Sequence, residues 1–164
     1  NLVNGEVRMM KAPYDVLDVC RYVIGYCNAN DYPISNLKLQ KLLYFIQAYF
    51  LTQLGRPCFA EDIEAWDFGP VVPEAYHQYK QFGAGSIPYV FNDPENWNTK
   101  NIDDDDKEYI CQVLDALAKF SATDLVTVTH RQDPWKNVYD STKYHIKITN
   151  ESIKKYFDRL NNER

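Results

Sequence analysis

Residues 35–54 constrain the fold more than any other part of the sequence, because their apolar residues recur at helical spacing on two sides. One face carries Leu39, Leu42, Leu43, Ile46 and Phe50. The other side carries Leu37, Tyr44, Ala48 and Leu51 beside Gln40, Lys41 and Gln47. A helix that is apolar on two sides is usually enclosed by other elements. The sequence therefore predicts a central helix that begins after an N-cap at Ser35 and ends before Gly55.

Helices are also predicted on both sides of this central segment. Asp15 is a typical N-cap for a helix that ends within residues 28–31. Pro73 suits the first position of a helix that ends at Gly83, since proline is favoured there. Residues 83–102 are rich in Gly, Pro and Asn and indicate a long irregular connection.

The C-terminal half contains three further helical patterns. Four aspartates at positions 103–106 favour the positive end of a helix, and we interpret them as a solvated helix start. Ser121 is expected to cap a second helix, which Pro134 and Trp135 close. Asn150 is expected to cap a final helix. Its apolar face carries Ile153, Tyr156, Phe157 and Leu160.

The signals for β structure are short. Residues 63–68 alternate apolar and acidic side chains, which predicts a short strand or extended run that Gly69 and Pro70 break. Residues 89–91 and 144–148 give two more short strand signals. The predicted fold class is therefore mainly α, an α-rich α+β fold: a compact single-domain helical fold around a central helix, with a small antiparallel β element.

Length and charge limit the domain organisation and the partners. A chain of 164 residues is enough for one domain, to which we assign residues 11–164. Residues 1–10 lack periodicity, and we interpret them as a disordered start or a cloning remnant. With 18 basic and 23 acidic residues the net charge is −5, which disfavours nucleic acid as a partner of the whole chain. No apolar run approaches the ~18 residues of a membrane span, so no membrane contact is expected.

Motifs for metal binding and catalysis are hard to find. Cysteines at positions 20, 27, 58 and 111 form no C-x-x-C pair and have no histidine at metal-ligand spacing. We expect free thiols in a reducing compartment, with no metal and no cofactor. The histidines at positions 77, 130 and 145 are scattered and are interpreted as surface or hydrogen-bonding side chains. A general base among them stays open, because active sites assemble in space.

Two motifs each allow two interpretations. In residues 66–73, one glycine and two prolines fix the backbone beside the rings of Trp66 and Phe68. This is either a rigid turn that packs Trp66 into the core or a preshaped surface ridge of the kind found in binding hot spots. Residues 129–135 either end a helix with Trp135 as a packing plug or form a polar cluster that faces a groove.

Four blocks, in order, resemble the Panacea domain, the SocA-like antitoxin family that is often described as phage-associated protein. They cover nearly the whole chain, from about residue 14 to residue 158. The blocks are residues 33–45; residues 64–66 with 69–73 and Tyr76; Thr129 and His130 with residues 133–135; and residues 153–157.

The resemblance implies a cytoplasmic bacterial antitoxin, including prophage-encoded forms, that neutralises a toxin encoded beside it. It also implies a mostly helical fold with a small β element. We expect direct protein–protein binding rather than enzymatic activity. Three alternatives are a proteolytic adaptor for the toxin, an enzyme that reverses the toxin's modification with His130 and Asp133 as candidates, and a nucleic-acid-binding regulator that uses the basic residues of 143–159.

The expected binding surface combines the second and third blocks with part of the central helix. Residues 61–76 hold five acids and no Lys or Arg, which suits a basic partner. Gly69, Pro70 and Pro73 restrict the backbone, so little entropy is lost on binding. The residues expected to contact the toxin, or to position that contact, are Gln40, Lys41, Tyr44, Trp66, Asp67, Phe68, Gly69, Pro70, Val71, Pro73, Thr129, His130 and Trp135.

Overall fold

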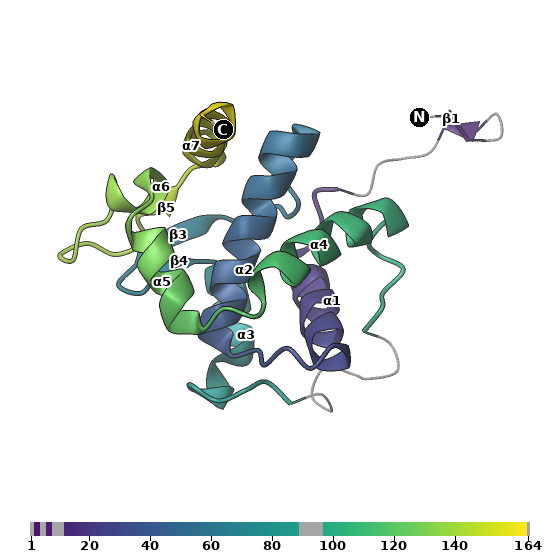
Figure 1. Ribbon diagram of the computed structural model, residues 1–164, viewed down its shortest axis with the longest axis horizontal. Helices are drawn as coiled ribbons and strands as arrows, with labels where there is room; N and C mark the ends of the chain where they lie inside the picture. Colours follow the sequence, from purple (N-terminus) through teal and green to yellow (C-terminus); the bar gives the residue numbers. More distant parts are fainter. Residues whose placement is uncertain (1, 4–5, 8–11, 89–96, 164) are drawn as a thin grey trace.

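The computed structural model describes residues 2–3, 6–7, 12–88 and 97–163, which form seven α-helices and two small antiparallel sheets (Figure 1). The predicted α-rich α+β class is confirmed. Near the start, β1 (Leu2–Val3) pairs with β2 (Glu6–Val7). The strand signal at residues 89–91 lies outside the described residues.

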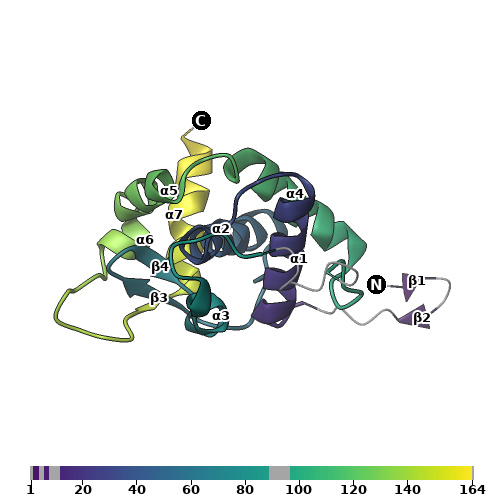
Figure 2. The same ribbon diagram turned by 90° about the horizontal axis from the view of Figure 1, so that it is seen from below.

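The central element is α2 (Asn36–Tyr49), as predicted, and eleven of its fourteen residues are buried. Figure 2 shows α2 nearly end-on, with the other long helices around it. It contacts α1 (Val16–Ala29), α3 (Pro73–Tyr79), α4 (Asp104–Leu117), α5 (Ala122–His130) and α7 (Asn150–Asn162). The chain therefore wraps around one helix that has almost no solvent face.

The ends of the helices follow the capping residues. Ser35 Oγ accepts a hydrogen bond from the Lys38 N–H at 3.2 Å, and the Asp15 side chain caps α1. After α2 the chain continues as a π-helical segment, η1 (Phe50–Leu54), and stops at Gly55 in a left-handed conformation.

The cap of α7 lies one residue before the predicted one. Thr149 Oγ1 accepts from the Ser152 N–H at 3.1 Å. The expected cap, Asn150, instead accepts a long 3.4 Å bond from Gln47 Nε2. Either residue type can cap a helix, so the sequence pattern could not separate the two positions.

The sheet beside α2 has the strand order β4-β3-β5. Its strands are β3 (Ile63–Trp66), β4 (Gly69–Val71) and β5 (Lys147–Ile148). The prediction that Gly69 and Pro70 break the extended run is wrong, because the chain turns at Asp67 and Phe68 and returns as β4. Pro70 is tolerated because β4 is an edge strand, where no further strand needs its missing N–H.

Two predicted elements near the C-terminus also differ from the structure. Pro134 and Trp135 do not simply close α5, because they belong to a new short helix, α6 (Asp133–Lys136). Proline is compatible with the first turn of a helix, where its missing N–H has no partner. The strand signal at residues 144–148 yields only β5, because His145 has a φ of 58° and Tyr144 is 90% exposed.

The four aspartates at the start of α4 are not all solvated, which corrects the interpretation of this segment. The Asp106 side chain is buried and accepts hydrogen bonds from Arg56 at 2.7 Å and from the Tyr14 hydroxyl. Its position four residues before Ile110 places it on the buried face of the helix. Burial and the bond to Asp106 raise the pKa of Tyr14.

The cysteines are free thiols, as expected. Cys20, Cys27 and Cys58 are buried, and burial raises the pKa of Cys27 to about 12. In the part of the chain that the structure describes, no three side chains of the His, Cys, Asp and Glu types come together in a way that could hold a metal ion. No helix in the same part is long and apolar enough to cross a membrane.

Replacing Leu43 with alanine should lower the free energy of unfolding by about 2–5 kcal/mol, because a fully buried side chain leaves a cavity. Gln78→Ala, at an exposed position of α3, is the control and should change it by less than about 0.5 kcal/mol. Urea denaturation measures both. A cost for Leu43→Ala as small as that of the control would mean that α2 is not the core of the fold.

Candidate functional site

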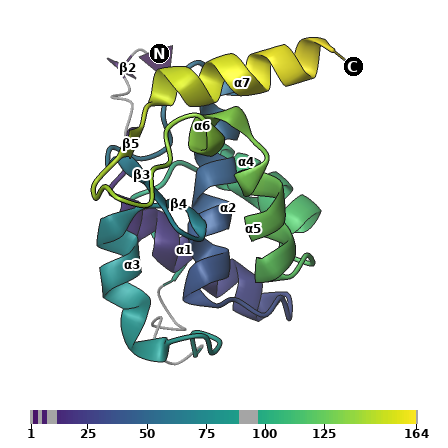
Figure 3. The same ribbon diagram turned by 90° about the vertical axis from the view of Figure 1, so that its left-hand side faces the viewer.

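The second and third sequence blocks meet at the β3–β4 hairpin, which lies beside α2 and below α6 in Figure 3. Asp67 and Phe68 form the turn between the two strands, and Trp66 pairs with Gly69 at its base. Phe68 is 66% exposed, compared with 50% for Phe120 on the turn after α4. The tip of the hairpin therefore offers an aromatic ring to solvent.

Side chains of α2 hold the hairpin from beneath. Lys41 Nζ donates to the Pro70 carbonyl at 2.7 Å, and Gln40 Oε1 accepts from the Val72 N–H at 3.0 Å. Gln40 in turn donates to Asn36 at 3.0 Å. These backbone groups point away from β3, so α2 satisfies the polar edge that another strand would otherwise occupy.

Lys41 is a lysine without solvent access in the interior of the protein. Burial lowers its pKa to about 7, because taking an ammonium group out of water disfavours the charged form. Its amine therefore sits close to a change of charge at neutral pH while it holds the Pro70 carbonyl. The hairpin depends on a hydrogen bond whose donor is costly to bury.

Gly69 is required where the hairpin approaches α2 and α5. Its φ is 107°, a conformation that side chains rarely adopt. A Cβ atom at this position would lie 2.9 Å from Lys41 Cε and 3.0 Å from Thr129 Oγ1. Both the backbone conformation and the close approach therefore exclude other residues.

A stack of three rings flanks the hairpin. The His130 and Trp135 rings lie 4.0 Å apart at 16°, and the Trp135 and Tyr139 rings lie 4.4 Å apart at 17°. Trp135 Nε1 donates to the Trp66 carbonyl at 2.8 Å, and the Tyr139 hydroxyl donates to Asp67. The stack therefore ties both sides of the turn to the segment that follows α5.

The predicted residues differ in how far the structure exposes them to solvent. Only Asp67 and Phe68 are exposed, while Trp66, Pro73, His130 and Trp135 are partly buried. The remaining seven are buried: Gln40, Lys41, Tyr44, Gly69, Pro70, Val71 and Thr129. The buried set can position a contact but has no surface of its own to offer.

Two residues of the site were not among the predicted contact residues. Tyr139 completes the ring stack, and Gln132 Oε1 accepts from the buried Tyr44 hydroxyl at 2.8 Å. Tyr139 follows Trp135 by four residues and its backbone N–H donates to the Trp135 carbonyl, a helix-like spacing that could have indicated it. Gln132 lies in the motif of residues 129–135, but its partner is 88 residues away and could not be read from that motif.

Trp66 matches neither of its two interpretations fully. It is partly buried, and its ring packs edge-on against Tyr76 with the centroids 5.0 Å apart. Its Nε1 donates to Glu64 at 3.0 Å. Trp66 therefore links the hairpin to α3 rather than filling the core or standing free on the surface.

The interpretation of residues 61–76 as a uniformly acidic surface is corrected by the pairing in the fold. Glu61 accepts from the Val16 N–H at 3.1 Å, at the start of α1. Asp62 lies 3.2 Å from Lys147, and Glu64 lies 3.4 Å from His145. Because β5 places Lys147 beside β3, part of the predicted basic segment offsets part of the acidic one.

The Lys41 amine makes stability depend on pH. Between pH 7 and the ordinary lysine pKa near 10.5, the unfolded chain holds a proton that folded Lys41 does not. The contribution of Lys41 to the free energy of unfolding is therefore least favourable below pH 7 and becomes more favourable as the pH rises. Relative to Lys41→Met, the wild-type free energy of unfolding should increase by up to about 1.4 kcal/mol per pH unit above pH 7.

Denaturation of both proteins between pH 6.5 and 9 measures this difference, and other titrating groups, such as the buried thiols, cancel in the comparison. Parallel stability profiles for wild type and Lys41→Met across this range would show that the lysine keeps an ordinary pKa.

Gly69→Ala should destabilise the protein by more than a strained φ alone would. Gly55→Ala is the matched control, because Gly55 also has a positive φ of 69° but would place its Cβ in open space. We expect a cost of about 1 kcal/mol for Gly55→Ala and about 2–3 kcal/mol for Gly69→Ala. Equal costs in urea denaturation would mean that the contact with Lys41 and Thr129 yields easily.

Comparisons with known proteins show the family of the chain. The model of the family described as Antitoxin SocA-like, Panacea domain matches residues 39–136, a range that contains the hairpin, α2 from Leu39 onward and two of the three stacked rings. Antitoxin SocA of Caulobacter vibrioides (strain NA1000 / CB15N) is 37% identical over 134 residues, which cover 74% of this chain and 68% of that protein. No solved structure matches.

The family match spans more than half of the chain, and the identity to the Caulobacter protein extends beyond it. The resemblance first seen in four sequence blocks is thereby confirmed. The chain belongs to the SocA-like family with a Panacea domain.

Proposed function

We propose that this protein is an antitoxin that neutralises its cognate toxin by binding it directly, through the tip of the β3–β4 hairpin and the adjoining ring stack. The antitoxin role is supported by the family and by the similar Antitoxin SocA. The mode of action and the contact surface are inferred from the geometry of the site.

The observation that carries the proposal is the exposure of Phe68 on a hairpin that is held on every side. Lys41 fixes β4, Trp135 fixes the end of β3, and Tyr139 fixes the turn. Because the backbone that carries the Phe68 ring is held in this way, little backbone entropy is lost when a partner covers the ring. Rigid aromatic side chains in such positions are typical of binding hot spots.

The charge at the tip refines the kind of toxin surface that fits. Asp67 is exposed beside Phe68, and its hydrogen bond from Tyr139 comes from a neutral donor. Its negative charge is therefore not offset by a cation among the described residues. The expected toxin surface therefore has an apolar pocket for the Phe68 ring and a basic group next to it. Such a pairing would speed encounter and fix the orientation of the complex.

The residues offered as catalytic candidates have structural contacts instead. Asp133 lies 2.9 Å from Arg159 in an ion pair that joins α6 to α7. The His130 ring is stacked on Trp135. These contacts favour binding over enzymatic reversal as the mechanism, with the toxin held in a stoichiometric complex.

The test uses the product of the neighbouring reading frame, if it stops growth alone and not together with this chain. Phe68→Ser and Asp67→Lys should each raise the Kd for that toxin by about tenfold or more and weaken rescue of growth. Melting temperatures should stay near the wild-type value, since both side chains are exposed. Asp67→Asn separates the effect of the negative charge from that of the hydrogen bond, because the amide oxygen can still accept from Tyr139.

Phe120→Ser is the matched control, because Phe120 is a ring that is 50% exposed on the turn between α4 and α5. It should bind toxin like the wild type. Wild-type affinity in Phe68→Ser and Asp67→Lys, with normal melting, would show that the hairpin tip is not the contact. Full rescue by a small fraction of an equivalent of this protein would contradict stoichiometric binding.

A further inference from the structure

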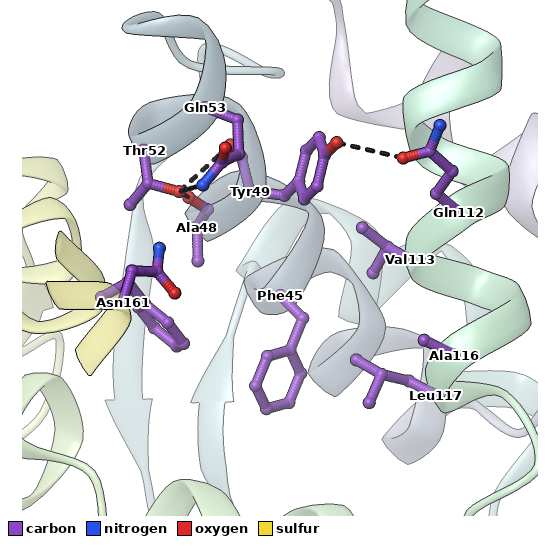
Figure 4. A pocket seen from close by; sticks show the side chains of 11 residues that line it. Phe45, Ala48, Tyr49, Thr52, Gln53, Gln112, Val113, Ala116, Leu117 and Asn161 are labelled. Atoms are coloured by element: carbon purple, nitrogen blue, oxygen red, sulfur yellow. Dashed lines mark hydrogen bonds between the residues drawn. The ribbon is translucent and has the colours of Figure 1, made fainter. Parts of the chain in front are cut away.

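A second feature of the surface lies away from the hairpin, in an open groove between α2 with η1, α4 and α7. The groove has a volume of ≈ 440 Å³, and Figure 4 shows its lining side chains converging from three helical segments. Its apolar lining consists of Phe45, Ala48, Tyr49, Val113, Ala116, Leu117 and Phe157. Its polar lining consists of Thr52, Gln53, Gln112 and Asn161.

The chemistry of the lining selects an apolar occupant. Of the 164 residues, 18 are basic and 23 acidic, yet the groove is lined by none of them. The polar members carry amide or hydroxyl groups, and Tyr49 donates to Gln112 at 3.1 Å across the gap between α2 and α4. A surface with aromatic and aliphatic walls and a neutral rim matches the grooves that accept the apolar stripe of a helix.

Charge beside the groove adds a second constraint. Asp105 and Glu108 precede Gln112 by seven and four residues, so they continue its stripe along α4, and both are exposed. On the opposite wall, Lys154 lies 2.6 Å from Asp158, so the charged residues of α7 nearest to Asn161 offset each other. The flank of the groove is therefore acidic toward the N-terminal end of α4, whereas the exposed Lys119 follows its C-terminal end. Along α7 the flank is nearly neutral.

The polar end of the groove is formed by an unusual piece of backbone. Thr52 and Gln53 belong to η1, whose π-helical turns are wider than those of an α-helix. Short π-helical turns are frequent at functional sites. Here Thr52 and Gln53 of η1 line the same groove as Phe45 and Phe157.

We propose that this groove is a docking site for an amphipathic helix of a partner protein, with an uncharged apolar stripe that enters the groove and basic residues that lie over Asp105 and Glu108. The site is separate from the toxin-contact surface at Phe68. The protein would thus present one face to its toxin and another to a basic helical segment.

The experiment uses the full chain and a fluorescently labelled peptide of about 18 residues, long enough to become helical when bound. Leucines at helical spacing form its apolar stripe, and lysines flank that stripe. We expect saturable binding in a fluorescence anisotropy titration. A peptide of the same composition with the leucines scattered should bind at least roughly tenfold more weakly, because it has no continuous apolar face.

Two variants of the protein test the position of the peptide. Ala116→Arg places a large cation on an exposed position of the groove wall and should raise the Kd by about tenfold or more. Its matched control is Ala84→Arg, at an exposed turn far from α4 in sequence, which should bind normally. Glu108→Lys should weaken binding of the lysine-flanked peptide and strengthen binding of a glutamate-flanked version.

The peptide should bind Phe68→Ser as it binds wild type, so failure of the hairpin proposal and failure of this one can be told apart. Three outcomes would overturn the inference. They are equal binding of the ordered and scattered peptides, wild-type affinity in Ala116→Arg, and self-association of the chain that Ala116→Arg abolishes. The last would assign the groove to a second copy of this chain.

Discussion

The burial of α2 is the constraint on which the rest of the structure depends. Because the helix has almost no solvent face, each polar side chain on it must find a partner inside the protein or lose the hydrogen bonds it made to water. Gln40, Lys41 and Tyr44 find these partners 29 to 88 residues further along the chain. Gln47 finds its partner nearer, at the backbone N–H of Cys58. The central helix therefore does two tasks: its apolar residues form the core, and its polar residues fix the surrounding loops.

This arrangement explains why the proposed contact surface is rigid although it is a two-residue turn. The turn itself is short, and an isolated hairpin of this size would be marginal in water. On one side β3 pairs with the short strand β5, and on the outer edge of β4 contacts from α2 stand in for a further strand. The ring stack and α3 add contacts to Trp66 at the base of the turn. Support of this kind orders the backbone of the exposed tip before any partner arrives. The conformational entropy of the tip is therefore lost on folding rather than on binding.

The two proposed contact surfaces, the hairpin tip and the groove, both depend on side chains of α2. At the hairpin, polar residues of α2 reach outward to hold a protruding ring. At the groove, Phe45 and Tyr49 of the same helix stay partly uncovered, because α4 and α7 approach α2 without closing over it. A protruding ring suits a concave partner and a groove suits a helix, which is why we assign them to different occupants.

The helical class, the central position of α2 and most helix starts could be predicted from the sequence, because they follow from local periodicity and from the chemistry of capping residues such as Asp15, Ser35 and Ser121. The sequence also drew attention to residues 66–73 and 129–135, which the structure brings together. Tertiary structure alone decided what each residue does there. Lysine is usually a surface residue, but the fold buries Lys41 completely. Asp106 is one of four consecutive acids that suggest a solvated helix start, but the structure buries it against Arg56 and Tyr14. Pairing across long separations is a property of the packed chain, so no local pattern could reveal the partners of Lys41 and Asp106.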